Sequence, residues 1–212
     1  MTSLFLSAAL TFLVIIDPIG NVPIFVGVTQ GRSQVERRAI AVRAVSVAAV
    51  TLVIFGVLGN YILEFLGITL AALRIAGGIL LLLLAIDMVL ARQSGLRSTT
   101  ETEDREAEHK DDVAVFPLAI PLIAGPGAMT SVLLMVGKAD HHLAGIAVVI
   151  GVMLGVLLVT LIAFFSASWL MDRLGLTGVN VVGRVLGIVL AALAVQNIVD
   201  GLAKTFPVLL HG

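Results

Sequence analysis

The sequence predicts an all-α integral membrane protein with six transmembrane helices, arranged as two inverted three-helix repeats in which helices one and four are broken. The 212-residue chain is 59% hydrophobic and only 13% charged, with a mean hydropathy of +1.12. A soluble domain needs far more polar surface than this. The chain also contains apolar runs about as long as the ~20 residues that a helix needs to cross a bilayer. These runs are residues 4–29, 44–63, 71–91, 113–136, 143–171 and 179–203.

Charge and cysteine content exclude several other kinds of protein. The formal net charge is −1, so the chain lacks the basic surface that binds nucleic acid. Because it contains no cysteine, neither disulfides nor thiolate metal sites are available. We therefore expect no cofactor and no metal. The first residues, "MTSLFLSAAL", contain no Lys or Arg ahead of the apolar run, so we expect a retained first helix instead of a cleaved signal peptide.

An internal repeat relates the first three runs to the last three. "LGIT" at residues 66–69 recurs as "LGLT" at residues 174–177, and Arg74 and Arg184 open the third and sixth runs. Runs one and four each contain a central Gly/Pro interruption. Several ordered matches at a nearly constant spacing indicate a duplication. The predicted organisation is a first repeat at residues 1–91, a polar cytoplasmic linker at 92–112, and a second repeat at 113–212.

Because each repeat has three spans, an odd number, the second repeat enters the membrane from the opposite side. The two repeats are then inverted, as is common in secondary transporters. Ten of the 13 Lys and Arg residues fall in the connections after runs one, three and five or at their edges. Because basic residues favour the cytoplasmic side, we expect those connections in the cytoplasm and both termini on the outer side.

The interruption in run one lies in "IIDPIGNVPIFVG", residues 15–27. Pro18 and Pro23 lack a backbone donor and block helical hydrogen bonds, and Gly20 permits backbone geometry that other residues resist. In run four, "PLAIPLIAGPGAMT" at residues 117–130 has the same effect. Broken backbone inside a membrane is tolerated only where protein or a water-filled cavity satisfies it. We expect the two breaks to meet near the bilayer centre and to hold a polar solute.

Asp17 and Asn21 are the polar side chains of the first break. A charged side chain at the bilayer centre costs at least ~2.5 kcal/mol and usually has a function, so Asp17 is a candidate binding residue. The alternative is that Asp17 caps the half-helix that opens at Pro18. The Asn21 amide suits a carboxylate or an amine of a solute. Its alternative role is a hydrogen bond to a freed backbone carbonyl.

The paired motifs "DPIGNVPIF" and "PLAIPLIAGPGAM" resemble those of the MarC family of bacterial and archaeal inner-membrane proteins, and the resemblance covers essentially the whole chain. That family is similar to the lysine-exporter-like superfamily, and some members are described as transporters of small neutral amino acids. The resemblance implies a transporter-like protein in the inner membrane and leaves its substrate open. The motif positions that it carries over are Asp17, Pro18, Gly20, Asn21, Pro23, Pro121, Gly125, Pro126, Gly127 and Ala128.

Two further features have alternative interpretations. Arg74 and Arg184 either extend to the membrane interface or lean inward to pair with Asp17 or with a substrate carboxylate. The GxxxG patterns at residues 151–155 and 183–187 indicate close helix packing. We favour packing within one subunit over a dimer interface, and a homo-oligomer stays open.

The sequence favours a transporter of small polar solutes, with the lipid bilayer and a small-molecule solute as its partners and no nucleic acid. One alternative is a structural or regulatory membrane protein. An intramembrane enzyme is less well supported, because no HExxH motif, no intramembrane histidine and no Walker-type nucleotide loop occur in the sequence. We therefore expect no enzymatic activity.

Overall fold

The computed structural model describes residues 2–90, 113–139 and 142–206. Over these residues all regular secondary structure is helical, and no strand occurs. The predicted linker at residues 92–112 lies outside the described residues.

The first half of the chain contains four helices. They are α1 (Thr2–Ile16), α2 (Val22–Val28), α3 (Gln34–Phe65) and α4 (Leu70–Leu90). α3 begins with a capping box, in which the Ser33 amide donates to Oε2 of Glu36 at 2.7 Å and the Glu36 amide donates to Oγ of Ser33 at 3.3 Å. Gly67 ends the turn after α3 with a φ of 67°, a conformation that glycine adopts freely. Thr69 then caps α4 by accepting from the Ala72 amide at 3.1 Å.

The second half contains the π-helical segment η1 (Ala114–Ile123), followed by α6 (Pro126–Lys138), α7 (Leu143–Phe165) and α8 (Ala167–Thr205). η1 and α6 are bent by 53° relative to each other. α8 is kinked at Gly175, where φ is 62°. This glycine belongs to "LGLT" and has the same left-handed conformation as Gly67 of "LGIT".

The structure is that of a multi-pass membrane protein. Four helices of the described chain are long and apolar enough to cross a bilayer, and the bent pair η1–α6 brings the number to five. The sequence predicted six spans, and the difference arises in the first apolar run. The break divides this run into a 15-residue α1 and a 7-residue α2. At ~1.5 Å per residue, neither helix alone reaches across a hydrocarbon core of ~30 Å.

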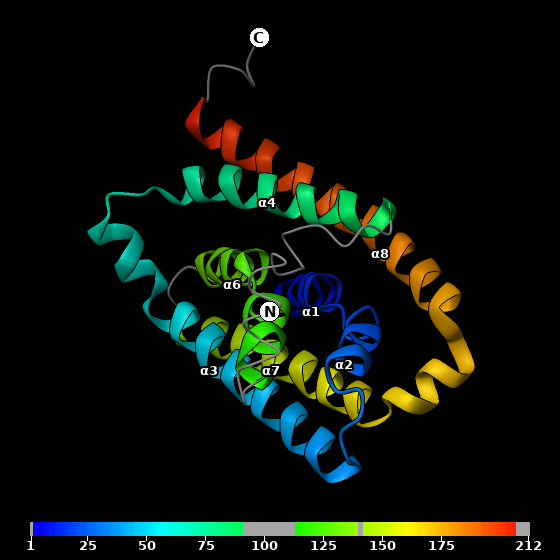
Figure 1. Cartoon of the computed structure of the whole chain (residues 1–212). Coiled ribbons are helices and arrows are strands. Elements are labelled where there is room, and N and C mark those ends of the chain that lie inside the picture. The colour runs from blue at the N-terminus through cyan, green and yellow to red at the C-terminus, as the bar shows by residue number, and fades with distance from the viewer. Residues whose placement is uncertain (1, 91–112, 140–141, 207–212) are drawn as a thin grey trace.

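The helices form three layers (Figure 1): α4 and α8 lie side by side on one side, α3 and α7 on the opposite side, and α1 and α6 between them. α4 and α8 are antiparallel, since Gly201 lies against Ala71 while Gly187 lies against Met88. Glycines bring the two backbones close together, because a Cβ on Gly78 would lie 2.8 Å from the carbonyl oxygen of Ala194. Such small-residue contacts are typical of membrane helix pairs.

The expected role of the GxxxG patterns is only partly correct. Gly187 packs against α4, but a Cβ on Gly151, Gly155 or Gly183 would meet nothing within 4 Å. The prediction that residues 151–155 mediate close packing within one subunit is therefore wrong. Those glycines lie on the exposed face of α7, which apolar periodicity alone does not distinguish from its buried face.

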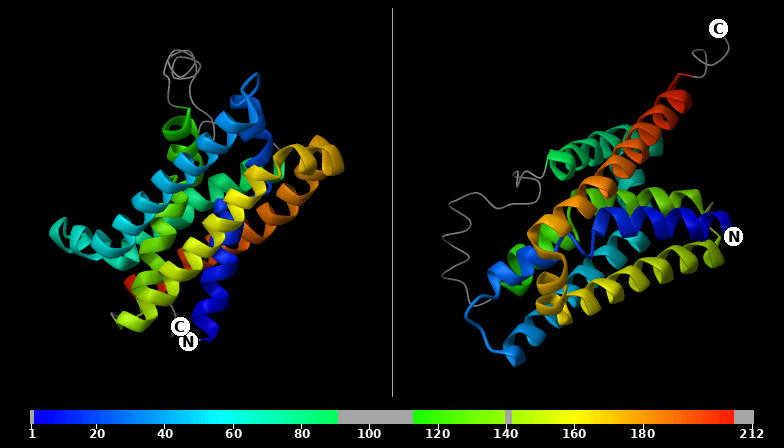
Figure 2. Two further views of the ribbon diagram at one scale, coloured as in Figure 1. Left: turned by 90° about the horizontal axis from the view of Figure 1, so that it is seen from below. Right: turned by 90° about the vertical axis from the view of Figure 1, so that its right-hand side faces the viewer.

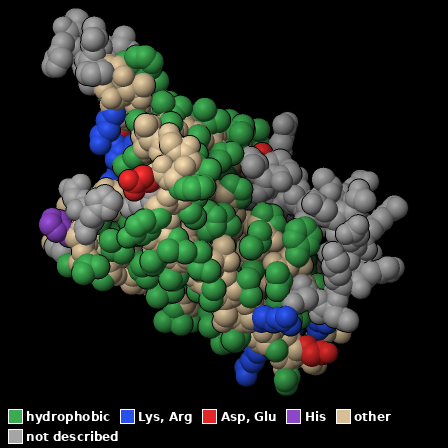
Figure 3. All heavy atoms as spheres, turned by 90° about the vertical axis from the view of Figure 1, so that its left-hand side faces the viewer, with side chains coloured by type: hydrophobic (Ala, Val, Ile, Leu, Met, Phe, Trp, Pro, Cys, Tyr) green, Lys and Arg blue, Asp and Glu red, His purple; other side chains and the backbone are tan. Residues whose placement is uncertain are grey.

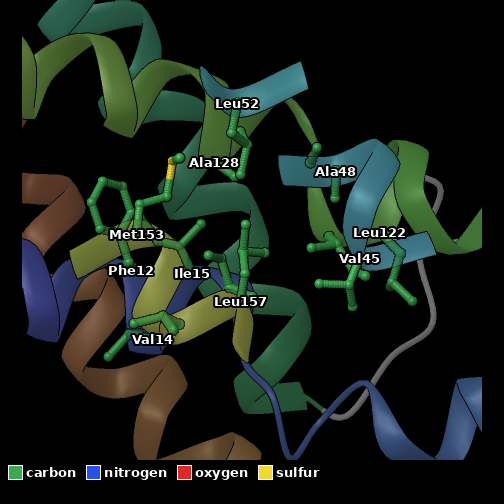
Figure 4. Packing of buried hydrophobic residues seen from close by; sticks show 14 of the residues in the cluster. Phe12, Val14, Ile15, Val45, Ala48, Leu52, Leu122, Ala128, Met153 and Leu157 are labelled. Atoms are coloured by element: carbon green, nitrogen blue, oxygen red, sulfur yellow. The ribbon is translucent and has the colours of Figure 1, made fainter. Parts of the chain in front are cut away.

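One hydrophobic core joins the layers. Figure 4 shows part of it, with labelled side chains from α1, α3, η1, α6 and α7. Hydrophobic side chains also cover much of the outer surface, and Figure 3 shows them between charged groups near the two ends of the visible face. Phe65 is 90% exposed and Leu143 84% exposed. In water such a surface would drive association, whereas in a bilayer it faces lipid.

The long axis of the molecule has two distinct ends (Figure 2). The α2–α3 connection and the α7–α8 junction lie at one end. The beginning of α1, the end of α6 and the beginning of α7 lie at the other. The two breaks fall between these ends.

Candidate functional site

The first break begins where α1 ends at Ile16. Asp17 has a φ of 48°, a left-handed conformation that Asp and Asn tolerate better than most residues. Its Oδ1 accepts a hydrogen bond from the Gly20 amide at 3.0 Å. A Cβ on residue 20 would overlap the Asp17 carboxylate, so this turn accommodates only glycine there. Asp17 thus stabilises the turn between α1 and α2. It does not cap a half-helix that opens at Pro18, because α2 begins only at Val22.

Asn21 completes the first break with its side-chain amide. Nδ2 of Asn21 donates to the carbonyl oxygen of Ile16 at 2.7 Å, which is one of the carbonyls left unsatisfied where α1 ends. Asn21 thus has the backbone role that was its alternative interpretation. Oδ1 of the same side chain is buried and has no hydrogen-bond partner. Both side chains are enclosed, since Asp17 is 0% and Asn21 1% exposed.

The two prolines of the first motif lie in the turn after α1 and at the start of α2. Pro18 is buried in the turn, and Pro23 lies in the first turn of α2, where its missing donor does no harm. α2 is held against the rest of the protein by the Phe25 ring, which stacks on Phe164 of α7 at 4.4 Å between centroids. The Arg37 guanidinium lies 5.8 Å from the centroid of the Phe25 ring.

The second break lies at residues 116–125, whereas the predicted interruption covered residues 117–130, the last part of which is helical in α6. Phe116 and Ile120 have extended backbone, as expected for residues that precede prolines, here Pro117 and Pro121. The chain then turns at Gly125, and Pro126 begins α6. A Cβ on Gly125 would collide with the carbonyl oxygen of Pro121, so the close approach of the two segments requires glycine.

The end of α1 lies against the beginning of α6. The Cβ position of Gly127 is 3.9 Å from Cγ2 of Ile15, and 3.1 Å from Cδ2 of Leu81 on α4. These elements enclose a cavity of ≈ 30 Å³. That volume admits one or two water molecules and is far below the ≈ 300–1,000 Å³ of typical ligand pockets. The cavity is lined mainly by Ile15, Leu84, Pro121 and residues 125–128.

The cavity unites the predicted residues of the second break, namely Pro121, Gly125, Pro126, Gly127 and Ala128. Asp17 and Asn21 do not line it, although Ile15 does. In this structure the side chains of the first break bond within that break, and the second break lines a small cavity.

The two arginines have different environments. Arg184 is exposed on α8, so it does not join the breaks. Arg74 is buried at 7% exposure, and its Cβ lies 3.2 Å from the Cβ position of Gly201 on α8. Arg74 thus does not extend to the surface, and the sequence match with Arg184 does not extend to their surroundings.

Ser131 is a further polar residue near the second break, and it is not among the residues predicted for the site. Ser131 lies on α6 about one turn beyond Gly127, is 1% exposed, and has an Oγ without a hydrogen-bond partner. Its neighbour Thr130 donates to the Pro126 carbonyl at 2.8 Å. The sequence feature that could have indicated Ser131 is the Thr-Ser pair directly after "GPGAM", inside an apolar run.

Comparisons with known proteins match nearly the whole chain. A family model described as "MarC family integral membrane protein" matches residues 2–206. The chain is 37% identical to the UPF0056 membrane protein YvbG of Bacillus subtilis, over 99% of each chain. It is 34% identical to YhcE of Escherichia coli, over 93% of this chain and 91% of that protein. A UPF0056 membrane protein of Archaeoglobus fulgidus is 38% identical over 95% and 93%. No solved structure matches.

Proposed function

The chain belongs to the MarC family of integral membrane proteins, and from this premise we propose that it transports small polar solutes, in particular amino acids. The solute site lies at the two breaks, and the residues of both motifs form it. The chain acts as a carrier and not as an enzyme. Its partners are the lipid bilayer and the solute.

The observation that carries this proposal is the unpaired carbonyl of Asn21. Oδ1 of Asn21 is buried without a hydrogen-bond partner, in a side chain whose amide group is already used. A buried unsatisfied polar atom costs about 1–3 kcal/mol. It lies beside a buried acid in a helix interruption, where hydrocarbon offers no donor. An ammonium or amide group of a solute would supply the missing donor.

The second break provides complementary chemistry. α6 begins at Pro126, and the first backbone N–H groups of a helix favour negative charge. A carboxylate suits this end, whereas an ammonium group suits Asp17 and Asn21. An amino acid carries both groups. The cavity of ≈ 30 Å³ beside Gly125–Ala128 must widen for a solute to enter, as alternating access requires.

For the architecture we propose six spans as two inverted repeats in the inner membrane, with both termini outside. In this arrangement α1 with α2 forms one broken span, and η1 with α6 forms the other. The left-handed Gly67 and Gly175 support the repeat, since each precedes the last long helical stretch of its half. The separation of the α2–α3 connection from the beginning of α1 (Figure 2) supports the topology.

Reconstituted vesicles test the function. The purified protein is inserted into liposomes, and uptake and counterflow are measured with a panel of radiolabelled amino acids, using protein-free liposomes as the control. Saturable flux that only the protein-containing vesicles show is the expected result. Absence of flux for every amino acid, under proton and sodium gradients of either direction, would overturn the proposal and leave a structural or regulatory membrane protein.

A further inference from the structure

A group of charged side chains lies where α4, α6 and α8 meet. It consists of Arg74 on α4, Lys138 at the end of α6 and Asp200 on α8, and the charges of Arg74 and Asp200 both act on Lys138. The three helices are in close contact there, since the Cβ position of Gly137 on α6 lies 3.0 Å from Leu70 of α4, and that of Gly201 on α8 lies 3.2 Å from Cβ of Arg74. The group lies at the opposite end of α6 from its break, which is ~18 Å away along the helix.

Arg74 is the unusual member of this group. It is only 7% exposed, and its Nε is buried without a hydrogen-bond partner. Oδ1 of the nearby Asp200 accepts from Nε2 of Gln196 at 2.7 Å, and no hydrogen bond joins this carboxylate to Nε of Arg74. The buried Nε of Arg74 is thus a donor of a charged group without an acceptor in the part of the chain that the structure describes. A buried charge is normally paired.

The local charge balance favours an anion. Among the described residues, this group contains two cations and one carboxylate, which leaves about one positive charge. Arg74 also lies one turn into α4, where the helix dipole adds positive potential. Lys138 has a simpler explanation on its own, since a cation is favoured at the end of α6. That explanation does not extend to Arg74.

We propose that Arg74 and Lys138 bind a monovalent oxyanion at the α4–α6–α8 junction. The guanidinium group suits such ligands because its N–H groups bind two oxygens at once. A free carboxylate and the phosphodiester of a lipid headgroup share this chemistry. The site is separate from the two breaks, and the proposal does not require that the chain transports a solute.

Anion binding is measured on the purified full-length chain in a neutral detergent. Acetate is titrated at constant ionic strength while thermal unfolding is followed, with acetamide as the neutral control. In a second arm, retention of phosphatidylglycerol is followed by native mass spectrometry. A response to acetate identifies a free carboxylate as a ligand, and retained phosphatidylglycerol identifies the lipid phosphate. Either response supports the site, and absence of both overturns it.

Variants then assign the binding to the named residues. Arg74→Gln should weaken binding about ten-fold or more, while Arg184→Gln, the matched change at an exposed arginine of α8, should leave it unchanged. The anion-free Arg74→Gln protein should be at least as stable as the wild type, because it no longer buries a charged side chain whose Nε lacks a hydrogen-bond partner. Lys138→Gln changes an exposed side chain and should weaken binding severalfold even if Arg74→Gln does not fold. Undiminished binding in both Arg74→Gln and Lys138→Gln would contradict the proposal.

Discussion

The Asp17 carboxylate packs directly against Gly20, where only a residue without a side chain leaves room for it. The Gly20 amide donates to Oδ1 of Asp17 at 3.0 Å, and the Asp17 carboxylate fills the position that a Cβ on residue 20 would take. The spacing in "DPIG" follows from this pair, since a short Asp side chain bonds local backbone amides in turns. The motif is therefore a structural unit of the break as well as the predicted solute site.

Gly20→Ala should destabilise the protein. The new methyl group overlaps the Asp17 carboxylate, and overpacking of this kind costs about 1–3 kcal/mol. Thermal unfolding in detergent, followed by size-exclusion chromatography, measures the effect. Gly27→Ala is the matched control, because Gly27 lies in α2 with nothing within 4 Å of its Cβ position. It should be neutral or stabilising by about 0.5–1 kcal/mol. Equal effects of the two changes would contradict the pairing of Gly20 with Asp17.

The α4–α8 contact predicts a second contrast between glycines. Gly78→Ala places a methyl group 2.8 Å from the Ala194 carbonyl oxygen and 3.1 Å from the Ile198 amide nitrogen. These are backbone atoms that cannot move aside, so the two helices must separate. We expect a loss of about 1–3 kcal/mol in stability, measured by the same unfolding assay.

The control for Gly78 is Gly151→Ala, on the open face of α7. Its Cβ position meets no atom within 4 Å, so the change should leave the melting temperature unchanged or slightly raised. A large loss of stability at Gly151 would instead show that another chain covers this face, which would support a homo-oligomer.

The long helices could be predicted because each contains an apolar run about as long as a membrane-spanning helix requires. The ends of the helices were less predictable. α3 begins at Gln34, before its apolar run, because Ser33 and Glu36 cap a polar first turn. The second break begins at Phe116, because each proline favours an extended backbone conformation in the residue that precedes it. The sequence shows these prolines, but it does not show whether packing against neighbouring helices will keep the segment helical or allow the break.

The sequence predicted the residues of the candidate site and a meeting of the two breaks near the bilayer centre, but not the contacts within each break. The sequence left two roles open for Asn21, and only the structure shows that its amide group bonds the Ile16 carbonyl. Likewise, the position of Arg74 near the start of a helix is readable, but its burial depends on α6 and α8 packing over it. Spacing gives a residue's place along its own helix. It does not give the identity of the helix that covers it.

Membrane topology can be tested without a transport assay. Reporter fusions at residue 99 and after the C-terminus, both outside the described residues, should read cytoplasmic and periplasmic respectively. The reason is that an inverted repeat with three spans in each half places the linker and the C-terminus on opposite sides. Readings on the same side would exclude this topology.

Asp17→Asn separates the structural role of Asp17 from a role of its charge. Asn retains an oxygen that can accept from the Gly20 amide, and it tolerates the left-handed φ of 48° observed at Asp17. The variant should therefore fold and insert normally, with an unfolding temperature close to that of the wild type. If the carboxylate binds a solute ammonium group or a coupled proton, amino acid flux in vesicles should fall about ten-fold or more, since hydrogen bonds to charged groups are about twice as strong as neutral ones.

The matched control for Asp17→Asn is Asp172→Asn, the same change at an exposed acid on α8, which should leave flux unaltered. A general effect of charge on insertion or orientation would lower flux in both variants, whereas a role in solute binding would lower it only at residue 17. Vesicle orientation is checked by protease accessibility, so that flux is compared per correctly inserted molecule. Undiminished flux through correctly inserted Asp17→Asn protein would reduce Asp17 to its hydrogen bond with Gly20, because Asn replaces Asp in such a bond with little loss.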